Sequence, residues 1–192
     1  MLPIGINTNF GPNATGTITL GSRMPRQIGW LPLPGVVTVT IEQTARQQLQ
    51  ELWSSVKGIM LSSSHYLSLP LRRLIDGLTR TRDDDRIVDY AIGLEALLLK
   101  GDKEQGELSY RFRLRGAMVL AETGEDRHKA FQDLKDFYDA RSAIVHGDSV
   151  SKLNLLAGNG EQMLRKIWKW HLDQGLTRQG AIARIDRRIL GE

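Results

Sequence analysis

The spacing of apolar residues changes once along this chain, near residue 42. From there to the C-terminus, apolar residues recur every three or four positions, which places them on one face of an α-helix. Glycine, proline and serine-rich stretches interrupt this pattern and divide it into successive helices. The helices are predicted over residues 44–61, 70–78, 81–100, 108–121, 126–146, 161–172 and 177–190, with a loop over 147–160.

Two of these helices carry clear end signals. Thr81 is followed by three aspartates at 83–85, and acidic residues are favourable at the positive N-terminal end of a helix dipole. Gly147 follows the helix that ends at residue 146, where glycine commonly terminates a helix. The pattern therefore predicts an all-α bundle over residues 42–192, with the four helices between residues 70 and 147 as its core.

Residues 1–41 have a different composition. Five of the six prolines of the chain lie there, among many Asn, Gly and Thr residues. Residues 16–20 and 36–41 are rich in β-branched side chains, which favour short strands. We expect an irregular, β-prone N-terminal segment over 1–41, followed by the helical domain over 42–192.

Composition narrows the class of protein. Of its 192 residues, 41% are hydrophobic and 25% are charged, as in globular proteins that bury a core. There is no cysteine, which excludes disulfides and thiolate metal sites, and the four histidines lack the spacing of metal ligands. No signal peptide or membrane span is evident, so we expect a cytoplasmic protein. The net charge of +4 is a mild bias toward polyanions and decides nothing alone.

Two charged residues fall within apolar helix faces. At roughly 100° per residue, Glu95 lies in the middle of the apolar arc of helix 81–100, and Arg141 lies near the middle of the arc of helix 126–146. A buried charge without a partner is costly, so we predict that Glu95 and Arg141 form an ion pair. In the alternatives, Glu95 pairs with Arg113 or Arg115, or the centre of the arc opens onto a cleft.

The helix that carries Arg141 also carries His146 at its end. These two residues are separated by roughly 140° around the helix, and His146 falls on a polar side. Histidine titrates near neutrality, and a guanidinium binds phosphate oxygens while staying charged. Together they suit chemistry on a phosphodiester, although one straight helix does not point both side chains at the same spot. A helix-end histidine that binds its own carbonyl groups is the structural alternative.

Three segments, taken together, resemble a known family. They are Arg86–Leu98 (RIVDYAIGLEALL), Glu107–Ala117 (ELSYRFRLRGA) and Phe137–Gly147 (FYDARSAIVHG), the last of which contains Arg141-x4-His146. In this order and spacing they are similar to the Apea-like branch of the HEPN superfamily. The resemblance covers roughly residues 70–172. It implies an HEPN-type helical bundle with four core helices and further flanking helices.

The resemblance also implies a function. Many HEPN proteins are metal-independent endoribonucleases that act as homodimers without a cofactor, often in prokaryotic antiviral defence or toxin-type systems. Arg141 would hold the phosphate of RNA, His146 would be the acid or base, and Glu95, Tyr138 and Ser142 would organise them. Active members often have Asn, Asp or His where this chain has Ser142. There are therefore two alternatives. The protein binds RNA without cleaving it, or it is a non-catalytic module that dimerises or binds a partner protein or upstream domain.

Other basic residues are weaker candidates for RNA binding. Arg111 and Arg115 lie one helical turn apart and could follow a phosphate backbone, although a solvated helix face is the commoner meaning of such a pair. The arginines of helix 177–190 flank an apolar series at Ile182, Ile185 and Ile189, which indicates a helix that packs on a body or a partner. A helical domain that senses a nucleotide ligand is a third option.

Overall fold

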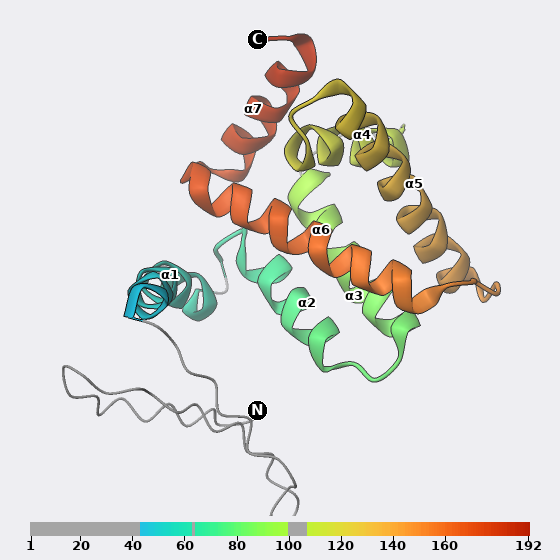
Figure 1. Cartoon of the computed structure of the whole chain (residues 1–192), viewed down its shortest axis with the longest axis horizontal. Helices are drawn as coiled ribbons and strands as arrows, with labels where there is room; N and C mark the ends of the chain where they lie inside the picture. Colours follow the sequence, from blue (N-terminus) through green and yellow to red (C-terminus); the bar gives the residue numbers. More distant parts are fainter. Residues whose placement is uncertain (1–42, 63, 100–106) are drawn as a thin grey trace, which may run out of the picture. The chain divides into compact units, whose positions relative to one another are not determined.

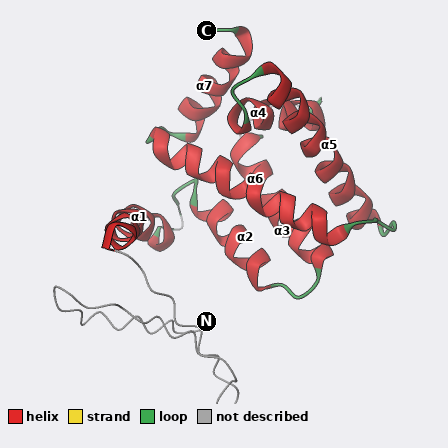
Figure 2. Cartoon of the chain, in the orientation of Figure 1, coloured by secondary structure: helices red, strands yellow, loops and turns green. Residues whose placement is uncertain are grey.

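The computed structural model describes residues 43–62, 64–99 and 107–192, which are almost entirely helical (Figures 1 and 2). The helices are α1 (Gln43–Leu61), α2 (Ser68–Thr79), α3 (Asp83–Leu98), α4 (Leu108–Leu120), α5 (Gly124–His146), α6 (Leu153–Gln174) and α7 (Arg178–Leu190). No strand occurs in the described part of the chain. The predicted all-α class is confirmed.

The chain divides into two compact units within α1, Met1–Val56 and Lys57–Glu192. The second unit contains α2 to α7 and all of the residues discussed below. The β-prone segment predicted over residues 1–41 lies outside the described residues, so its structure and the boundary at residue 42 stay predictions. Among the described residues, no helix is both long enough and apolar enough to cross a membrane.

Helix α3 is the centre of the second unit. It packs against α2, α4, α5 and α6, and six of its side chains are completely buried. These side chains belong to Ile87, Tyr90, Ala91, Leu94, Leu97 and Leu98. Because neighbours surround α3 on several sides, its apolar face is wider than that of a helix on the surface of a bundle.

Helix α6 also belongs to the core, where it runs across α3 (Figure 1). Its residues Leu164 and Ile167 are completely buried. The predicted core of four helices between residues 70 and 147 therefore needs one addition. The prediction of a loop over 147–160 was wrong from Leu153 onward, where α6 begins.

The error in the predicted loop has a specific cause. Asn and Gly are frequent between Asn154 and Gly160, and both disfavour a helix when they are judged locally. Gly160, however, faces the ring of Phe137 on α5, and a Cβ atom added to it would lie 2.2 Å from Phe137 Cε2. The close approach of α5 and α6 requires glycine at this position, and tertiary packing outweighs its low helix propensity.

An ion-pair cluster joins α2 to α3. Asp89, which is 3% exposed, accepts hydrogen bonds from Arg73 Nη1 and Arg80 Nε, each at 2.8 Å. Arg73 belongs to α2 and Arg80 directly follows it, so one buried carboxylate of α3 links the end of α2 to α3. Asp89 lies six residues before Glu95 on α3 and helps to set the position of that helix.

Candidate functional site

The ion pair predicted between α3 and α5 is confirmed. Arg141 Nη2 lies 3.4 Å from Glu95 Oε1. Their side chains are 28% and 26% exposed, so solvent reaches both of them. The alternative partners are engaged elsewhere: Arg113 Nε donates to the Ser109 carbonyl, and Arg115 pairs with Asp186.

The position of Glu95 on α3 differs from the prediction in one respect. The apolar arc was centred on Glu95, whereas the completely buried residues centre near Leu94. Val88, Ile92 and Leu99 share the side of Glu95 and are only half-buried. Glu95 therefore lies at the edge of the core, with 26% of its side chain exposed.

Tyr138 lies beside this pair on α5. The Arg141 Cζ atom is 5.9 Å from the centre of the Tyr138 ring, within range of a cation–π contact. The Tyr138 ring also packs against Phe112 of α4, with the ring centres 4.9 Å apart. Phe112 is completely buried, so the Tyr138 ring is packed against the core through α4.

Burial changes the titration of both acidic groups at the site. Burial raises the pKa of Glu95, and the charge of Arg141 partly offsets this. Burial also raises the pKa of Tyr138, with a further increase from Glu95 and a decrease from Arg141. The pKa of the Tyr138 phenol thus depends on the charges of both Glu95 and Arg141, so the three residues interact electrostatically.

Arg141 has donor capacity left over. Its Nε is buried and has no hydrogen-bond partner among the residues that the structure describes. A guanidinium carries five N–H donors in a fork that matches phosphate oxygens. Because 28% of the Arg141 side chain is exposed, an oxyanion could bind the terminal N–H groups of its guanidinium beside Glu95.

His146 lies at the C-terminal end of α5 and is exposed. The carbonyl groups that this helix end leaves open are satisfied by backbone donors: Gly147 N–H binds Ile144 O at 3.1 Å, and Asp148 N–H binds Ala143 O at 2.9 Å. Gly147 makes this closure possible through its positive φ of 83°. These two carbonyls are thus satisfied without the His146 imidazole.

The structure therefore brings together part of the predicted site. Glu95, Tyr138 and Arg141 meet, and Ser142 is half-buried directly after Arg141. His146 follows more than one turn later on the exposed side of α5, in agreement with the angular separation seen in the sequence. Arg141 thus faces Glu95 of α3, whereas His146 lies five residues later at the exposed end of α5.

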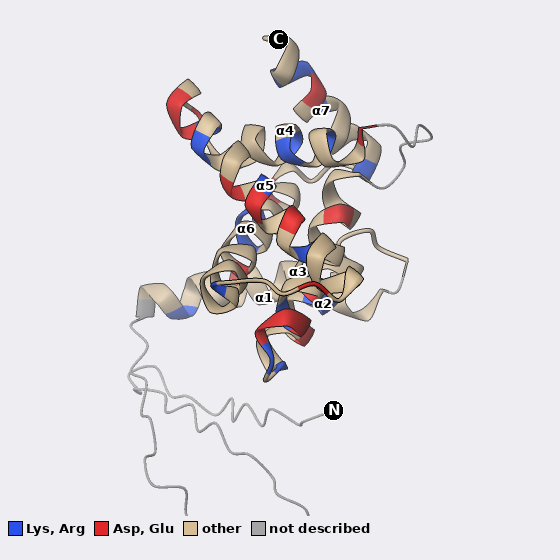
Figure 3. Ribbon diagram, turned by 90° about the vertical axis from the view of Figure 1, so that its right-hand side faces the viewer, with Lys and Arg blue, Asp and Glu red and all other residues tan. Residues whose placement is uncertain are grey.

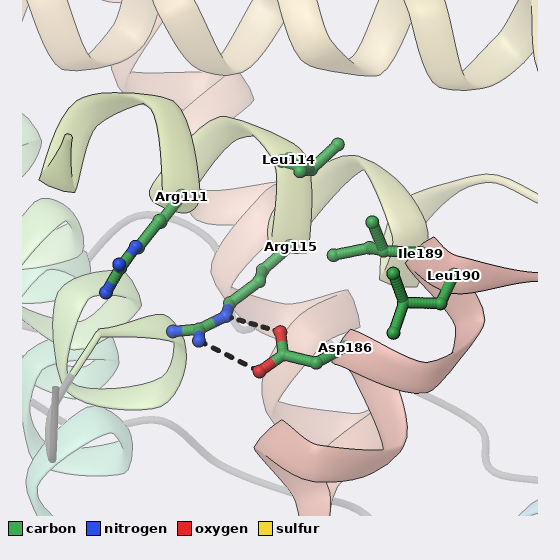
Figure 4. A pocket seen from close by; sticks show the side chains of 6 residues that line it. All are labelled: Arg111, Leu114, Arg115, Asp186, Ile189 and Leu190. Atoms are coloured by element: carbon green, nitrogen blue, oxygen red, sulfur yellow. Dashed lines mark hydrogen bonds and ion pairs between the residues drawn. The ribbon is translucent and has the colours of Figure 1, made fainter.

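The predicted RNA-binding arginines of α4 differ in their surroundings (Figure 4). Arg115 is buried, and its Nε and Nη2 donate to the two carboxylate oxygens of Asp186 on α7 at 2.8 and 3.0 Å. Its Nη1 donates to the Leu98 carbonyl at 2.8 Å. These contacts give Arg115 a structural role between α3, α4 and α7. Arg111 lines a cavity of about 350 Å³ with Arg115 and Asp186, and its phosphate-binding role stays a prediction.

Asp186 was missed by the sequence analysis. It is the only acidic residue of α7, where it lies among four arginines. A lone carboxylate on a basic, amphipathic helix was the available signal, because such a group commonly binds a basic residue of the surface that the helix covers. Its partner lies 71 residues away, a pairing that helical periodicity does not reveal.

A second hollow, of about 570 Å³, lies between α5 and the start of α6. Asp133, Asp136 and Asp139 line one side of it, and acidic residues are visible along α5 in Figure 3. Three carboxylates repel a phosphate backbone, so this hollow is a poor site for nucleic acid. Within the described ranges, no group of three or more potential metal ligands is present.

Trp168 and His171 of α6 belong to the core rather than to a base-stacking surface. Trp168 is buried, and its Nε1 donates to the Leu67 carbonyl at 3.1 Å. His171 is 1% exposed, and its Nδ1 lies 3.4 Å from the Tyr66 hydroxyl. Burial, with a further contribution from Arg178, lowers the pKa of His171 to about 4.

Comparison of the chain with family models, with curated proteins and with solved structures found no match. The HEPN resemblance therefore rests on the three sequence segments and their motif. The geometry of Glu95, Tyr138, Arg141 and His146 is the independent observation from which a function is argued.

Proposed function

We propose that this protein binds RNA at the Glu95–Arg141 site and cleaves it without a metal ion. One observation carries the proposal: Arg141 pairs with Glu95 while 28% of its side chain stays exposed, and the exposed His146 follows five residues later on the same helix. A guanidinium suits a phosphate, and an imidazole on the same helix suits proton transfer. The resemblance to HEPN ribonucleases points to the same chemistry.

The reaction would be a transesterification within the RNA. A base removes the proton of a 2′-hydroxyl, and the 2′-oxygen attacks the adjacent phosphorus. The bond to the 5′-oxygen breaks, and an acid protonates that oxygen, which leaves a 2′,3′-cyclic phosphate and a 5′-hydroxyl end. Arg141 would stabilise the charge on the phosphorane, and His146 would serve as the acid.

We assign the acidic role to His146, which lies exposed in the last turn of α5. One histidine in one chain cannot serve as acid and base at the same moment. A second copy of the chain, with its own Arg141 and His146 facing the same phosphate, would supply the other group, so the proposal includes a homodimer.

A non-catalytic binding module is the second candidate. It is favoured by Val145, which is 56% exposed directly before His146. An exposed apolar side chain beside His146 suits contact with a protein partner. In this case the Glu95–Arg141 pair would serve the specificity of that interface.

The test is an RNA cleavage assay in buffer with excess EDTA. We expect cleavage by the wild-type chain, and a loss of about 10²–10⁴-fold in the variant His146→Ala. His128→Ala is the matched control, because His128 is also an exposed histidine of α5 but lies at the opposite end of the helix. The cleaved ends should be a 2′,3′-cyclic phosphate and a 5′-hydroxyl.

Three outcomes would contradict parts of the proposal. Cleavage that disappears in EDTA would refute the metal-independent chemistry. Equal activity of His146→Ala and His128→Ala would remove His146 from the mechanism. RNA binding without cleavage, lost in Arg141→Ala, would favour the binding module.

A further inference from the structure

The carboxylate beside Arg141 restricts which anions the site accepts. A phosphate oxygen that binds Arg141 comes close to Glu95, because the two groups are 3.4 Å apart. Two negative charges at this separation repel each other. A favourable ligand therefore has to offer Glu95 a hydrogen-bond donor next to the group that it offers Arg141.

RNA carries these two groups side by side. In each nucleotide the 2′-hydroxyl, a donor and an acceptor, is bonded to the carbon next to the one that bears the 3′-phosphate. DNA has the same phosphate but no donor at that carbon. A site that combines a guanidinium with an accessible carboxylate is therefore complementary to RNA and mismatched to DNA.

We propose that Glu95 accepts a hydrogen bond from the 2′-hydroxyl of the ribose whose 3′-phosphate is bound by Arg141, and that Glu95 thereby selects RNA over DNA. The inference rests on the proposed RNA-binding function, which it deepens by assigning the selective contact to one residue. It differs from a purely organising role, in which Glu95 would hold Arg141 in place and would not touch the ligand.

Three features of the site support this assignment. The Glu95 side chain is 26% exposed, so a bound nucleotide can reach its carboxylate. Within the described part of the chain, that carboxylate makes a long ion pair, 3.4 Å from Arg141 Nη2, and a carboxylate has about four acceptor positions on its two oxygens. Burial also makes the carboxylate less well hydrated than a surface group, and a DNA ligand that leaves it without a donor is penalised more strongly.

The experiment measures the affinity of three oligonucleotides of one sequence: RNA, RNA with fluorine in place of every 2′-hydroxyl, and DNA. The 2′-fluoro strand keeps the ribose shape of RNA but lacks the donor. Affinities are measured by fluorescence anisotropy in a His146→Ala background, so that no substrate is consumed. We expect RNA to bind about 10- to 100-fold more tightly than the other two strands, as for a hydrogen bond to a charged group.

Variants then locate the source of this preference. Glu95→Leu removes the acceptor and should reduce the ratio of RNA to 2′-fluoro affinity to nearly one. Glu161→Leu is the matched control, because Glu161 is 22% exposed and is paired with Arg86 and Arg165 on the same unit. It should leave the ratio unchanged. Circular dichroism of each variant checks that the helices are retained.

The outcomes separate the inference from the function on which it rests. RNA binding with no preference over the 2′-fluoro strand, or a preference that survives Glu95→Leu, overturns the inference and leaves the proposed RNA binding intact. If the background variant binds none of the three strands and the wild-type chain cleaves no RNA, the proposed function fails and the inference fails with it.

Discussion

Two glycines of α6, Gly158 and Gly160, lie two positions apart and therefore on nearly opposite sides of the helix, and they allow a sharp test of the core. A Cβ atom at Gly160 would lie 2.2 Å from Phe137 Cε2 and 2.8 Å from Phe137 Cζ. A Cβ atom at Gly158 would have no neighbour within 4 Å. The substitutions Gly160→Ala and Gly158→Ala are therefore chemically identical but should change stability in opposite directions.

The magnitudes follow from two opposing terms. Replacing glycine by alanine within a helix stabilises it by about 0.5–1 kcal/mol. Gly158→Ala should show this gain. At position 160 the same gain is opposed by overpacking against a completely buried ring, which typically costs about 1–3 kcal/mol. Because the approach is so close, Gly160→Ala should destabilise the protein by about 1–2 kcal/mol in total.

The free energy of unfolding is measured by urea denaturation, followed by the helical circular dichroism signal. Variants are compared where the slope of this free energy against urea concentration is the same. Phe137→Leu provides a further check, since a smaller side chain leaves room for the new methyl group. The double variant Gly160→Ala/Phe137→Leu should be more stable than the sum of the single effects predicts. A stabilising Gly160→Ala, or strict additivity with Phe137→Leu, would refute the close packing of α5 and α6. A Gly158→Ala variant without any gain would argue that residues before 160 are not helical.

Three further predictions concern charged groups. In a double-mutant cycle of Glu95→Gln and Arg141→Met, the free energies of unfolding should show a coupling of about 1 kcal/mol. The coupling is small because both side chains are about a quarter exposed and solvent weakens their attraction. Strictly additive effects would show that the pair does not stabilise the fold. Asp89→Ala should destabilise by about 2–3 kcal/mol through the loss of two charged hydrogen bonds, whereas Asp76→Ala, whose side chain is 50% exposed, should change little. In the folded protein the pKa of His171 is lowered from 6.5 to about 4. As the pH falls, the unfolded chain therefore binds the proton first. The contribution of His171 to stability is complete above pH 6.5 and declines as the pH falls toward 4. The decline should approach about 3 kcal/mol and be absent from His171→Gln; equal pH profiles of the two proteins would contradict it.

Local periodicity was sufficient for much of this protein. The all-α class, the approximate ends of α1 to α5 and the ion pair of Glu95 with Arg141 followed from the residues that recur at three and four positions. These features are predictable because the helical period is a property of neighbouring residues. An unpaired charge within an apolar face is also costly enough to demand a partner.

Tertiary structure decided the rest. Periodicity shows which face of a helix is apolar but not which helix covers it, so the start of α6 against Phe137 and the pairing of Arg115 with Asp186 were beyond local reasoning. The same limit explains Glu95: its accessible position depends on how many neighbours surround α3, and only their packing placed the carboxylate at the edge of the core. Sequence thus predicted a partner for Glu95 and offered Arg141, Arg113 and Arg115, and only tertiary packing chose Arg141 and left both side chains about a quarter exposed.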